Sequence, residues 1–565
     1  MTGPSRRTVL ATVGTLAAGA GLAGQSLAIE REQTGTDGSA QTDGWSQFRA
    51  TAARNGAVAA DAAPDGEYAA ASWTAETGET VFTGEVVAGD GAVYQPFVVS
   101  DRSFRGGVVA FDAETGAERW RRVAPSYSRE DGWPTGVGRA THAPAVGDGR
   151  LYLTSEPGYE GVEYGGLHAV DTETGETAWA KTERAWRGPP LLGDDALYVD
   201  GAALDPQSGD VAWTTRDGYE TRFVGLVDGT LYGMRFRTDA ADELVAWNAA
   251  DGSVQRTAEV DDDATFRDAA VAGDALYRSA GGVTDDGPNE VVSHDASDGR
   301  VRWRTRLTPE GEEAQAVLSA PAVADGTVYV HTAPSDSFDY GEGVLSTVYA
   351  LDAADGEVRW THDTSTALRG DPSAAGDTVY VGGHALPKKE AENPTMPRRY
   401  PTVHALAAAD GSDRWSYLVR AESDDSVLTT ETPALAGGRV YGGSYESTST
   451  ASDGAFALEA SDVAPDASNL PLSSDAPVAA IATDPADAER TELDAGTTVG
   501  LDGSASTGDV ETYEWDLDDT GSFETTGQTA EITLDFCGSL AVTLRVTGPD
   551  GARSTASVEL ATVEE

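Results

Sequence analysis

The chain of 565 residues contains a single cysteine, Cys537. One thiol cannot form an intramolecular disulfide, so the chain is not a disulfide-stapled scaffold. The same scarcity excludes a C-x-x-C-H haem attachment motif and any site that needs two adjacent cysteines. The seven histidines show no metal-binding spacing, and the sequence has neither a G-x-S-x-G motif nor a phosphate-binding loop. The familiar motifs of metal, haem, nucleotide and serine-hydrolase chemistry are therefore missing.

Positive charge is also scarce, because Lys181, Lys388 and Lys389 are the only lysines and the formal net charge is −55. Such a chain repels nucleic acid, so we expect no nucleic-acid partner. The acidic residues are spread along the whole sequence, which does not fit a single acidic patch for binding a partner. At molar salt the Debye length falls to about 3 Å, and self-repulsion is screened. The composition therefore predicts the surface of a halophilic protein.

The first 28 residues resemble a twin-arginine export signal. Arg6 and Arg7 precede a weakly apolar run rich in Ala and Gly, and small residues before a cleavage position follow up to Ala28. A membrane anchor is the alternative interpretation of this run. Gln25 occupies the place where a lipoprotein signal has its acylated cysteine, so lipidation is not expected. We predict export to the cell surface or medium, with residues 29–44 as a disordered linker.

The body of the chain repeats one pattern, of which "VYALDAADGEVRW" (348–360) is a clear copy. Asp, Gly and Trp recur at constant spacing at intervals of 34 to 59 residues. The copy at 244–256 differs because Arg256 replaces the tryptophan. A period of this length, with several short strands in each unit, predicts the blades of a β-propeller. The tryptophans expected to join the blades are Trp73, Trp120, Trp179, Trp213, Trp303, Trp360 and Trp415.

Counting the strand pairs upstream of each motif gives eight units between residues 45 and 461. The last unit lacks its outer strand, whereas an unpaired strand with Trp73 precedes the first unit. We therefore predict an all-β, eight-bladed propeller in which the Trp73 strand completes the last blade. Closure of this kind removes exposed sheet edges.

The repeated motif A-x-D-x-x-T-G-x-x-x-W resembles that of the pyrroloquinoline-quinone (PQQ) quinoprotein-like propellers, and the chain is similar to their halophilic archaeal members. This resemblance implies that Trp and Gly hold adjacent blades together. The family includes PQQ alcohol dehydrogenases as well as non-catalytic assembly and scaffold propellers. The dehydrogenases use an adjacent cysteine pair, Ca²⁺ and an Asp base. Because the cysteine pair is missing here, we expect neither bound PQQ nor its catalysis.

A second region follows a Pro- and Ser-containing linker at 462–476. Residues 477–565 alternate like short strands, which predicts an immunoglobulin-like β-sandwich. "LDGSAS" (501–506) and "YEWDLDD" (513–519) resemble the PKD (polycystic kidney disease) domain. The acidic side chains of this region could bind Ca²⁺, or they could serve as ordinary turn residues. The candidate ligands are Asp502, Asp516, Asp518 and Asp519.

A binding site is expected at the mouth of the propeller channel, where the innermost strands begin. Irregular segments at 124–142, 156–166, 333–346 and 384–401 belong to the same end, and functional residues concentrate in such loops. Arginines there would hold an anionic or polar ligand, or they would balance acidic neighbours. The candidate site residues are His142, Arg187, Arg222, Arg267, Asp268, Arg369, Asp371 and Glu431.

The sequence thus favours a monomeric, exported, non-catalytic propeller that binds or scaffolds a protein or glycan at the cell surface. It would contact a membrane only through an uncleaved signal segment. The alternative is an enzyme with its site at the channel mouth, either a PQQ-type dehydrogenase or a carboxylate-based glycan-active enzyme. Because the chain has 94 acidic residues, no catalytic pair can be selected from sequence alone.

Overall fold

The computed structural model describes residues 44–563 with internal gaps. The gaps are residues 79, 100–105, 124–141, 156–165, 183–185, 216–219, 238–240, 261–265, 281–288, 308–315, 335–344, 387–398, 421–427, 447–452, 467–468, 472–478, 487, 489–492, 495, 507, 519–522, 524, 535–537 and 549–552. The predicted signal and most of its linker lie outside the described residues, as do the central parts of the four irregular segments.

The first half of the repeat region forms four antiparallel sheets, numbered here in chain order. Sheet 1 contains β3 (Thr80–Thr83), β4 (Val87–Gly89), β5 (Ala92–Val99), β6 (Gly106–Asp112) and β7 (Glu118–Val123). Sheet 2 contains β8 (Ala145–Gly147), β9 (Arg150–Ser155), β10 (Gly166–Asp171) and β11 (Thr177–Lys181). Sheet 3 contains β12 (Leu191–Leu192), β13 (Leu197–Val199), β14 (Ala202–Leu204) and β15 (Val211–Thr214). Sheet 4 contains β16 (Glu220–Val227), β17 (Thr230–Phe236), β18 (Glu243–Asn248) and β19 (Val254–Glu259).

The second half continues the series with four more sheets. Sheet 5 contains β20 (Phe266–Ala272), β21 (Ala275–Ala280), β22 (Glu290–Asp295) and β23 (Val301–Arg306). Sheet 6 contains β24 (Ala316–Leu318), β25 (Ala322–Ala324), β26 (Thr327–Pro334), β27 (Ser346–Asp352) and β28 (Val358–Thr364). Sheet 7 contains β29 (Ala367–Ala375), β30 (Thr378–Ala385), β31 (Tyr400–Ala407) and β32 (Asp413–Leu418), to which β1 (Ala57–Val58) adds in parallel. Sheet 8 contains β33 (Leu428–Thr430), β34 (Ala434–Ala436), β35 (Arg439–Glu446), β36 (Asp453–Ser461) and β2 (Tyr68–Gly78).

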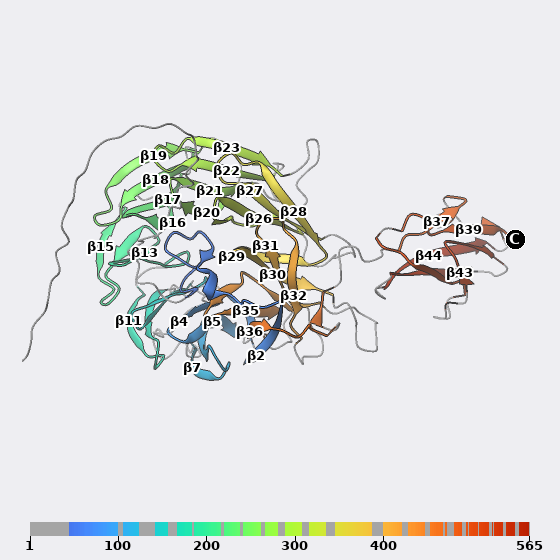
Figure 1. Ribbon diagram of the computed structural model, residues 1–565, viewed down its shortest axis with the longest axis horizontal. Coiled ribbons are helices and arrows are strands. Elements are labelled where there is room, and N and C mark those ends of the chain that lie inside the picture. Colours follow the sequence, from blue (N-terminus) through green and yellow to red (C-terminus); the bar gives the residue numbers. More distant parts are fainter. Residues whose placement is uncertain are drawn as a thin grey trace, which may run out of the picture. The chain divides into compact units, whose positions relative to one another are not determined.

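Sheet 8 is completed by the first long strand of the chain, as the sequence predicted. Strand β2 pairs antiparallel with β36, and Trp73 lies opposite Ala457. In each sheet the strands therefore run in chain order from the innermost to the outermost. Sheet 8 differs only in that its outermost strand, β2, comes from the beginning of the repeat region. Figure 1 shows the sheets following one another around a common centre. This all-β arrangement of four-stranded antiparallel sheets is consistent with a β-propeller.

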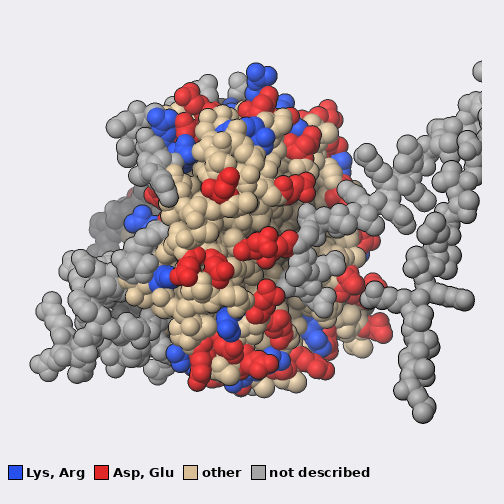
Figure 2. All heavy atoms as spheres, turned by 90° about the vertical axis from the view of Figure 1, so that its left-hand side faces the viewer, with Lys and Arg blue, Asp and Glu red and all other residues tan. Residues whose placement is uncertain are grey.

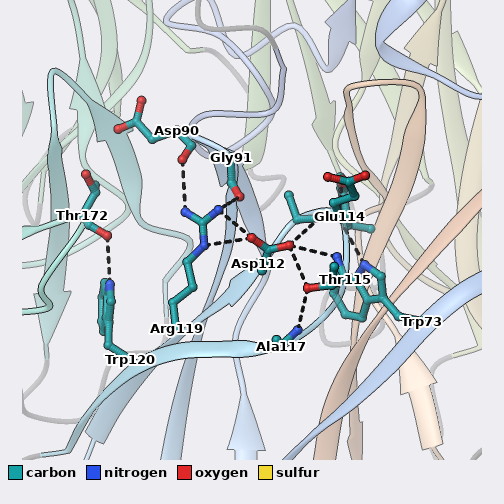
Figure 3. Close-up of polar contacts among 12 residues, drawn as sticks. Trp73, Asp90, Gly91, Asp112, Glu114, Thr115, Ala117, Arg119, Trp120 and Thr172 are labelled. Carbon is teal, nitrogen blue, oxygen red and sulfur yellow. Dashed lines mark hydrogen bonds and ion pairs between the residues drawn. The ribbon is translucent and has the colours of Figure 1, made fainter.

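The turns have the backbone that their residues favour. Asp-Gly pairs such as Asp90–Gly91 join strands with positive φ at both residues, 53° and 68°. This is the geometry of tight hairpin turns, which Asp tolerates and Gly adopts freely. In the outer turn of sheet 1, the Asp112 carboxylate accepts hydrogen bonds from the backbone N–H and the hydroxyl of Thr115 at 3.0 and 2.8 Å. Arg119 pairs with the same carboxylate at 2.8 Å (Figure 3).

The Trp and Gly residues that repeat at constant spacing within the chain form the contact between neighbouring sheets. The indole of Trp73 covers the turn at Gly116, where an added Cβ would lie 2.6 Å from the ring. Its Nε1 donates a hydrogen bond to the Ala113 carbonyl at 3.1 Å, and Trp120 makes the equivalent bond to Thr172 (Figure 3). Each such indole therefore packs its own sheet against the glycine turn of the next one. Among the described residues the contact recurs for Trp73, Trp120, Trp179, Trp213, Trp303 and Trp360, with N–H···O distances of 2.8–3.1 Å.

Two seams between sheets depart from this pattern. In sheet 8 the two outer strands, β36 and β2, are not consecutive in the chain, so no Asp-Gly turn joins them. Trp415 of sheet 7 therefore has no such turn to pack against. Trp415 is nevertheless buried, in a cluster that it shares with Tyr380 and with residues of sheet 8. At the seam between sheets 4 and 5 the tryptophan itself is missing, because Arg256 takes its place.

The C-terminal region forms two further sheets that share one buried cluster. One contains β37 (Ala482–Asp484), β39 (Thr498–Asp502) and β42 (Thr529–Thr533). The other contains β38 (Leu493–Asp494), β40 (Thr512–Asp516), β41 (Thr525–Thr526), β43 (Gly538–Thr547) and β44 (Arg553–Val563). Val499 and Leu501 of the first sheet pack with Trp515 and Leu544 of the second. Trp515 is fully buried, as expected of a core residue.

Acidic side chains are scattered over the face shown in Figure 2 rather than gathered in one patch. This distribution agrees with the even spread of Asp and Glu along the sequence. In the part of the chain that the structure describes, no helix combines the length and apolar character that a membrane crossing requires.

Candidate functional site

The segment that precedes the repeats (residues 44–63, the lead-in segment) determines which end of the sheets can hold a site. It includes a short 3₁₀ helix, η1 (Ala60–Ala62). Its backbone bonds to the inner strands of successive sheets, beginning with Trp45 O, which accepts from Ala88 N of sheet 1 at 2.8 Å. Ser46 O then accepts from sheet 2, and the Gln47 side chain bonds both backbone groups of Leu192 in sheet 3.

The same segment continues through the other five sheets in order. The accepting carbonyls are those of Ala52, Ala53, Asn55, Gly56 and Ala62, and the donors are Leu226, Val271, Val323, Ala374 and Gly438 of sheets 4 to 8. The donors of sheets 1 to 7 lie shortly before the first turn of their sheet. The lead-in segment therefore occupies the turn end of the inner strands, and a site on these strands must lie toward their beginnings.

Two arginines of the lead-in segment extend from it between the sheets. Arg54 donates to the carbonyls of Phe223 and Pro189, each at 2.7 Å, and so links sheet 4 to the chain just before sheet 3. Arg49 donates to Ala269 O at 3.0 Å and pairs with the Asp371 carboxylate at 3.4 Å. Both arginines are almost completely buried and have positive φ, 58° at Arg49 and 50° at Arg54. Such φ values are uncommon for residues other than glycine, so the surrounding contacts fix this backbone.

Asp371 is the centre of a charged cluster on the inner strands of sheets 6, 7, 8 and 1. Its carboxylate accepts from Ala320 N of sheet 6 at 2.9 Å, besides pairing with Arg49. Its own N–H donates to Thr432 Oγ1 at 2.9 Å, and that hydroxyl donates to Glu85 of sheet 1 at 2.6 Å. The lead-in segment and four sheets thus converge on this set of side chains, which Arg369 and Glu431 complete; we call it the channel cluster.

Two carboxyl groups of the channel cluster, those of Glu85 and Glu431, hold their protons more tightly than usual. Burial, followed by the charge of Asp371, raises the pKa of Glu431 to about 7. Burial, with the charges of Glu431 and Asp371 added, also raises the pKa of Glu85 well above its usual range. A desolvated carboxyl beside other carboxylates favours its neutral form. The carboxyl groups of Glu85 and Glu431 therefore favour the protonated form beside Asp371 and the two arginines of the cluster.

The structure brings three of the eight predicted site residues, Arg369, Asp371 and Glu431, into this cluster. His142 is half-buried at the start of sheet 2, Arg187 is exposed before sheet 3, and Arg222 of β16 lies 5.6 Å from the Phe236 ring. The side chains of Arg267 and Asp268 lie outside the described residues. In sheet 5, the residue that stands five positions before the one bonded to the lead-in segment is Phe266. The comparison of the repeats had assigned this position to Arg267. The predicted position on this strand is therefore off by one residue.

Sequence reasoning missed Glu85, Thr432 and Arg49. Glu85 follows Thr83 by two residues, and Thr432 follows Thr430 by two, just as Asp371 follows Arg369. A comparison of the inner strands that reached this third position would have found them. Arg49 lies outside the repeats. Its only signal was the occurrence of two arginines within "FRATAAR" in a chain so poor in positive charge.

The predicted calcium ligands occupy turns of the C-terminal region. Asp502 accepts a hydrogen bond from Ser504 N at 2.8 Å, and Asp516 is buried and accepts from Asp518 N at 3.3 Å. Asp519 lies outside the described residues, so the predicted cluster stays a prediction. Among the residues that are described, no three His, Cys, Asp or Glu side chains come together as metal ligands.

Among the described residues of the repeat region, those of the channel cluster do not match the PQQ site that the resemblance implies. The adjacent cysteine pair is missing from the sequence, and Cys537 belongs to the C-terminal region. The carboxyl groups of the channel cluster are engaged with Arg49 and Thr432 rather than grouped as a ligand set for Ca²⁺.

Both of the sequence relatives described below are the outer membrane protein assembly factor BamB. The outer membrane protein assembly factor BamB of Yersinia pestis is 33% identical over 117 residues, or 18% of this chain and 25% of that protein. The BamB of Burkholderia pseudomallei is 26% identical over 383 residues, or 64% of this chain and 84% of that protein. The chain thus spans only a quarter of the Yersinia relative but most of the Burkholderia one.

Solved structures that are similar to this chain include an alcohol dehydrogenase and an assembly factor. The quinohemoprotein alcohol dehydrogenase of Comamonas testosteroni has a TM-score of 0.48 and 13% identity, covering 76% of this chain and 82% of that one. BamB of Moraxella catarrhalis has a TM-score of 0.39 and 15% identity, covering 69% of this chain and 99% of that one.

The family described as outer membrane protein assembly factor BamB matches residues 53–201, 105–281 and 265–460, which together span more than half of the chain. The chain therefore belongs to this family of PQQ-like β-propeller repeat proteins.

Proposed function

We propose that this protein is an exported, non-catalytic propeller of eight blades that binds or scaffolds a protein or glycan partner through the end of the sheets opposite the lead-in segment. Its family and its sequence relatives are assembly factors of the outer membrane by name, which supports a scaffolding role outside the cytoplasm. The twin-arginine signal expected in residues 1–28 would export the folded chain. The C-terminal region would be an immunoglobulin-like, PKD-type accessory module.

The observation that carries this proposal is the path of the lead-in segment. It bonds to all eight sheets at their turn end, while the channel cluster lies nearer the beginnings of the inner strands. The connections that join one sheet to the next, and the second strand of a sheet to its third, leave the sheets at that same end. Rigid sheets that carry variable connections are a common arrangement for recognition.

A pull-down from an envelope extract at molar KCl tests the proposal. We compare the wild type, the double variant R369Q/E431Q in the channel cluster, and E114Q, an exposed residue of an outer turn at the opposite end, as the matched control. A partner at the cluster end is retained by the wild type and by E114Q and lost from the double variant, whose thermal unfolding is compared in parallel. Equal retention by the wild type and both variants, or no specific partner at all, would contradict the proposal.

A second measurement addresses the dehydrogenase alternative. Purified protein is mixed with PQQ and Ca²⁺, desalted, and examined by absorbance. No retained quinone is expected, since the cysteine pair of those enzymes is missing. A bound quinone with a red-shifted spectrum would overturn the non-catalytic assignment.

A further inference from the structure

Sheet 8 joins both ends of the repeat region, and polar contacts hold the inner part of its seam with sheet 7. Trp415 has no glycine turn to pack against at this seam. On the inner strands, the Ser373 hydroxyl of β29 donates to Pro433 O at 2.5 Å, and Asp371 N–H donates to Thr432 Oγ1 at 2.9 Å. The closure of sheet 8 onto sheet 7 therefore includes hydrogen bonds at the channel cluster.

The backbones of the two sheets also approach each other closely at this place. A Cβ added to Gly370 of β29 would lie 2.2 Å from Thr432 N, and one added to Gly382 of β30 would lie 2.4 Å from Glu431 O. Glu431 therefore stands where sheet 8 touches sheet 7 directly. A charge on its side chain acts across the seam rather than within one sheet.

Three carboxyl groups surround this contact, and each belongs to a different sheet. Asp371 is on sheet 7, Glu431 on sheet 8 and Glu85 on sheet 1, and all three residues are half-buried. The Thr432 hydroxyl of sheet 8 donates to the Glu85 carboxyl at 2.6 Å, so this bond crosses the seam between sheets 8 and 1. Both seams of sheet 8 thus lie between carboxyl groups.

The matching places on other inner strands are apolar. Glu85 and Asp371 stand at the third position of their inner strands, where sheets 2, 4 and 6 carry Ala143, Phe223 and Ala320. A change in the charge of the cluster therefore acts on the seams of sheet 8 and not on the seams between those sheets.

The other charged groups that face the cluster do not change their charge between pH 5 and 8. Among the described residues, the cations are Arg49 of the lead-in segment and Arg369 of sheet 7. Burial lowers the pKa of His331 of sheet 6 to about 4, and burial with the charges of Arg369 and Arg399 lowers that of His384 to about 3. Both histidines are therefore neutral, and three ionised carboxylates would outnumber the two guanidiniums.

We propose that sheet 8 is a pH-sensitive clasp, in which ionisation of Glu431 and Glu85 beside Asp371 loosens the inner part of both seams of sheet 8. The Trp73 contact on the outer strands, between sheets 8 and 1, stays in place, as do the seams of the other sheets. Protonation closes the clasp again. The clasp is a property of the fold itself and needs no bound partner.

The direction of this dependence follows from burial. Burial, followed by the charge of Asp371, raises the pKa of Glu431 from 4.5 to about 7, and burial also raises that of Glu85. In the loosened form water reaches both groups, so their pKa values return toward the ordinary value. The loosened form then binds fewer protons, and rising pH favours it by up to about ten-fold per pH unit for Glu431 alone.

Thiol labelling of a buried seam position tests the proposal. S373C reports the seam between sheets 7 and 8. S279C is the matched control, because Ser279 is also fully buried and its hydroxyl donates to Ser319 O across the seam between sheets 5 and 6. Both are made in the full chain with C537S, which removes the only native thiol. Labelling by 4,4′-dithiodipyridine at fixed KCl is divided by the rate of the same chain in denaturant at the same pH, which cancels ionisation of the thiol.

From pH 5.5 to 8 the relative labelling rate of S373C should rise at least about ten-fold, while that of S279C stays constant. E431Q should reduce the rise, and E85Q/E431Q should abolish it. Near-UV circular dichroism shows whether each variant is folded, and the comparison of S373C with S279C needs neither glutamine variant. The proposal is overturned if S373C does not respond to pH, if S279C rises with it, or if folded E85Q/E431Q keeps the full rise.

Discussion

At the scale of single residues, the glycine of each repeat meets two separate requirements. Its backbone is left-handed, with φ of 73° at Gly411, and the Trp360 ring lies where a Cβ would be, 2.5 Å away. The first requirement concerns only the turn, whereas the second concerns the neighbouring sheet. A glycine with the same backbone but nothing above it can therefore separate the two effects.

Gly326 provides that comparison, because its φ is also 73° and nothing lies within 4 Å of its Cβ position. We expect G326A to lower the free energy of unfolding by about 1 kcal/mol, the cost of a left-handed alanine. G411A should cost a further 1–3 kcal/mol or so, because the indole must move. Denaturant unfolding at molar salt measures both values. Equal losses in the two variants would show that the indole does not press on the turn.

The channel cluster predicts a dependence of stability on pH. Glu431 has a pKa of about 7 in the folded protein, above its ordinary value of 4.5. Between these values the folded state keeps a proton that the unfolded state has lost, so the wild type loses stability as pH rises. E431Q imitates the protonated form. Its melting temperature should match the wild type near pH 5 and exceed it near pH 8.

Thermal scans of both proteins at fixed KCl concentration check this difference. The comparison with E431Q removes the contribution of the buried histidines, such as His331 with a pKa lowered to about 4 by burial, because both proteins contain them. E114Q, an exposed control, should follow the wild type throughout. A gap between E431Q and the wild type that does not change with pH would mean that Glu431 is already ionised at pH 5.

At the scale of elements, the repeats were predictable, and residues 45–56 resemble the lead-in segment of the family, but the path of that segment across the sheets was not predictable. Asp, Gly and Trp recur at a fixed spacing because each repeat needs the same three side chains, and the orphan Trp73 strand revealed how sheet 8 is completed. The lead-in segment bonds to the sheets mainly through backbone carbonyls. Every residue has a carbonyl, so such contacts leave no pattern in the sequence.

The same distinction explains the outcome for the candidate site. Arg369 and Glu431 were found because the first positions of the recurring inner strands were compared, and Asp371 because it is an acidic neighbour of Arg369. Arg267 was misaligned by one residue relative to the inner strands of the other sheets. Arg49 reaches the cluster from outside the repeats, through a turn whose positive φ no repeat pattern specifies.

The lead-in segment is expected to contribute to stability through its buried arginines. R54M keeps the length of the side chain but removes the donors to Phe223 O and Pro189 O, both bonded at 2.7 Å. Loss of charged donors to buried carbonyls should lower the free energy of unfolding by about 2–4 kcal/mol. R300M is the control, because the Arg300 side chain is 86% exposed, and it should change stability by less than about 0.5 kcal/mol.

Chemical denaturation of both variants under identical salt measures these losses. An R54M loss no larger than that of R300M would show that water replaces the missing donors at both carbonyls. The lead-in segment would then rest on the sheets without stabilising them.

At the scale of the whole molecule, neighbouring sheets stabilise one another through their buried side chains. Buried clusters bridge adjacent sheets, such as the one that joins Tyr277 and Trp303 of sheet 5 to Val328 of sheet 6. The lead-in segment adds a connection that touches all eight sheets. Loss of one seam is therefore felt around the structure, although each seam is a local contact.

The net charge of −55 opposes this assembly, and it leads to a prediction about salt. Acidic residues outnumber basic ones, 94 to 39, so repulsion exceeds attraction when averaged over the surface. The Debye length falls from about 10 Å at 0.1 M salt to about 3 Å at 1 M. Raising KCl from 0.1 to 2 M should therefore raise the melting temperature by several degrees, and most of the gain should come before 1 M.

A charge variant separates screening from a general effect of solute on hydration. Replacing the exposed Asp61, Asp65, Glu114, Glu173 and Glu357 with lysine changes the charge by two at each position, so −55 becomes −45. This variant should melt higher than the wild type at 0.1 M KCl and gain less on the way to 2 M, since less repulsion remains to be screened. Sucrose acts by exclusion from the protein surface, so it should raise both proteins equally. If the variant and the wild type gained equally from KCl as well, the acidic surface would owe its effect to hydration rather than to screened repulsion.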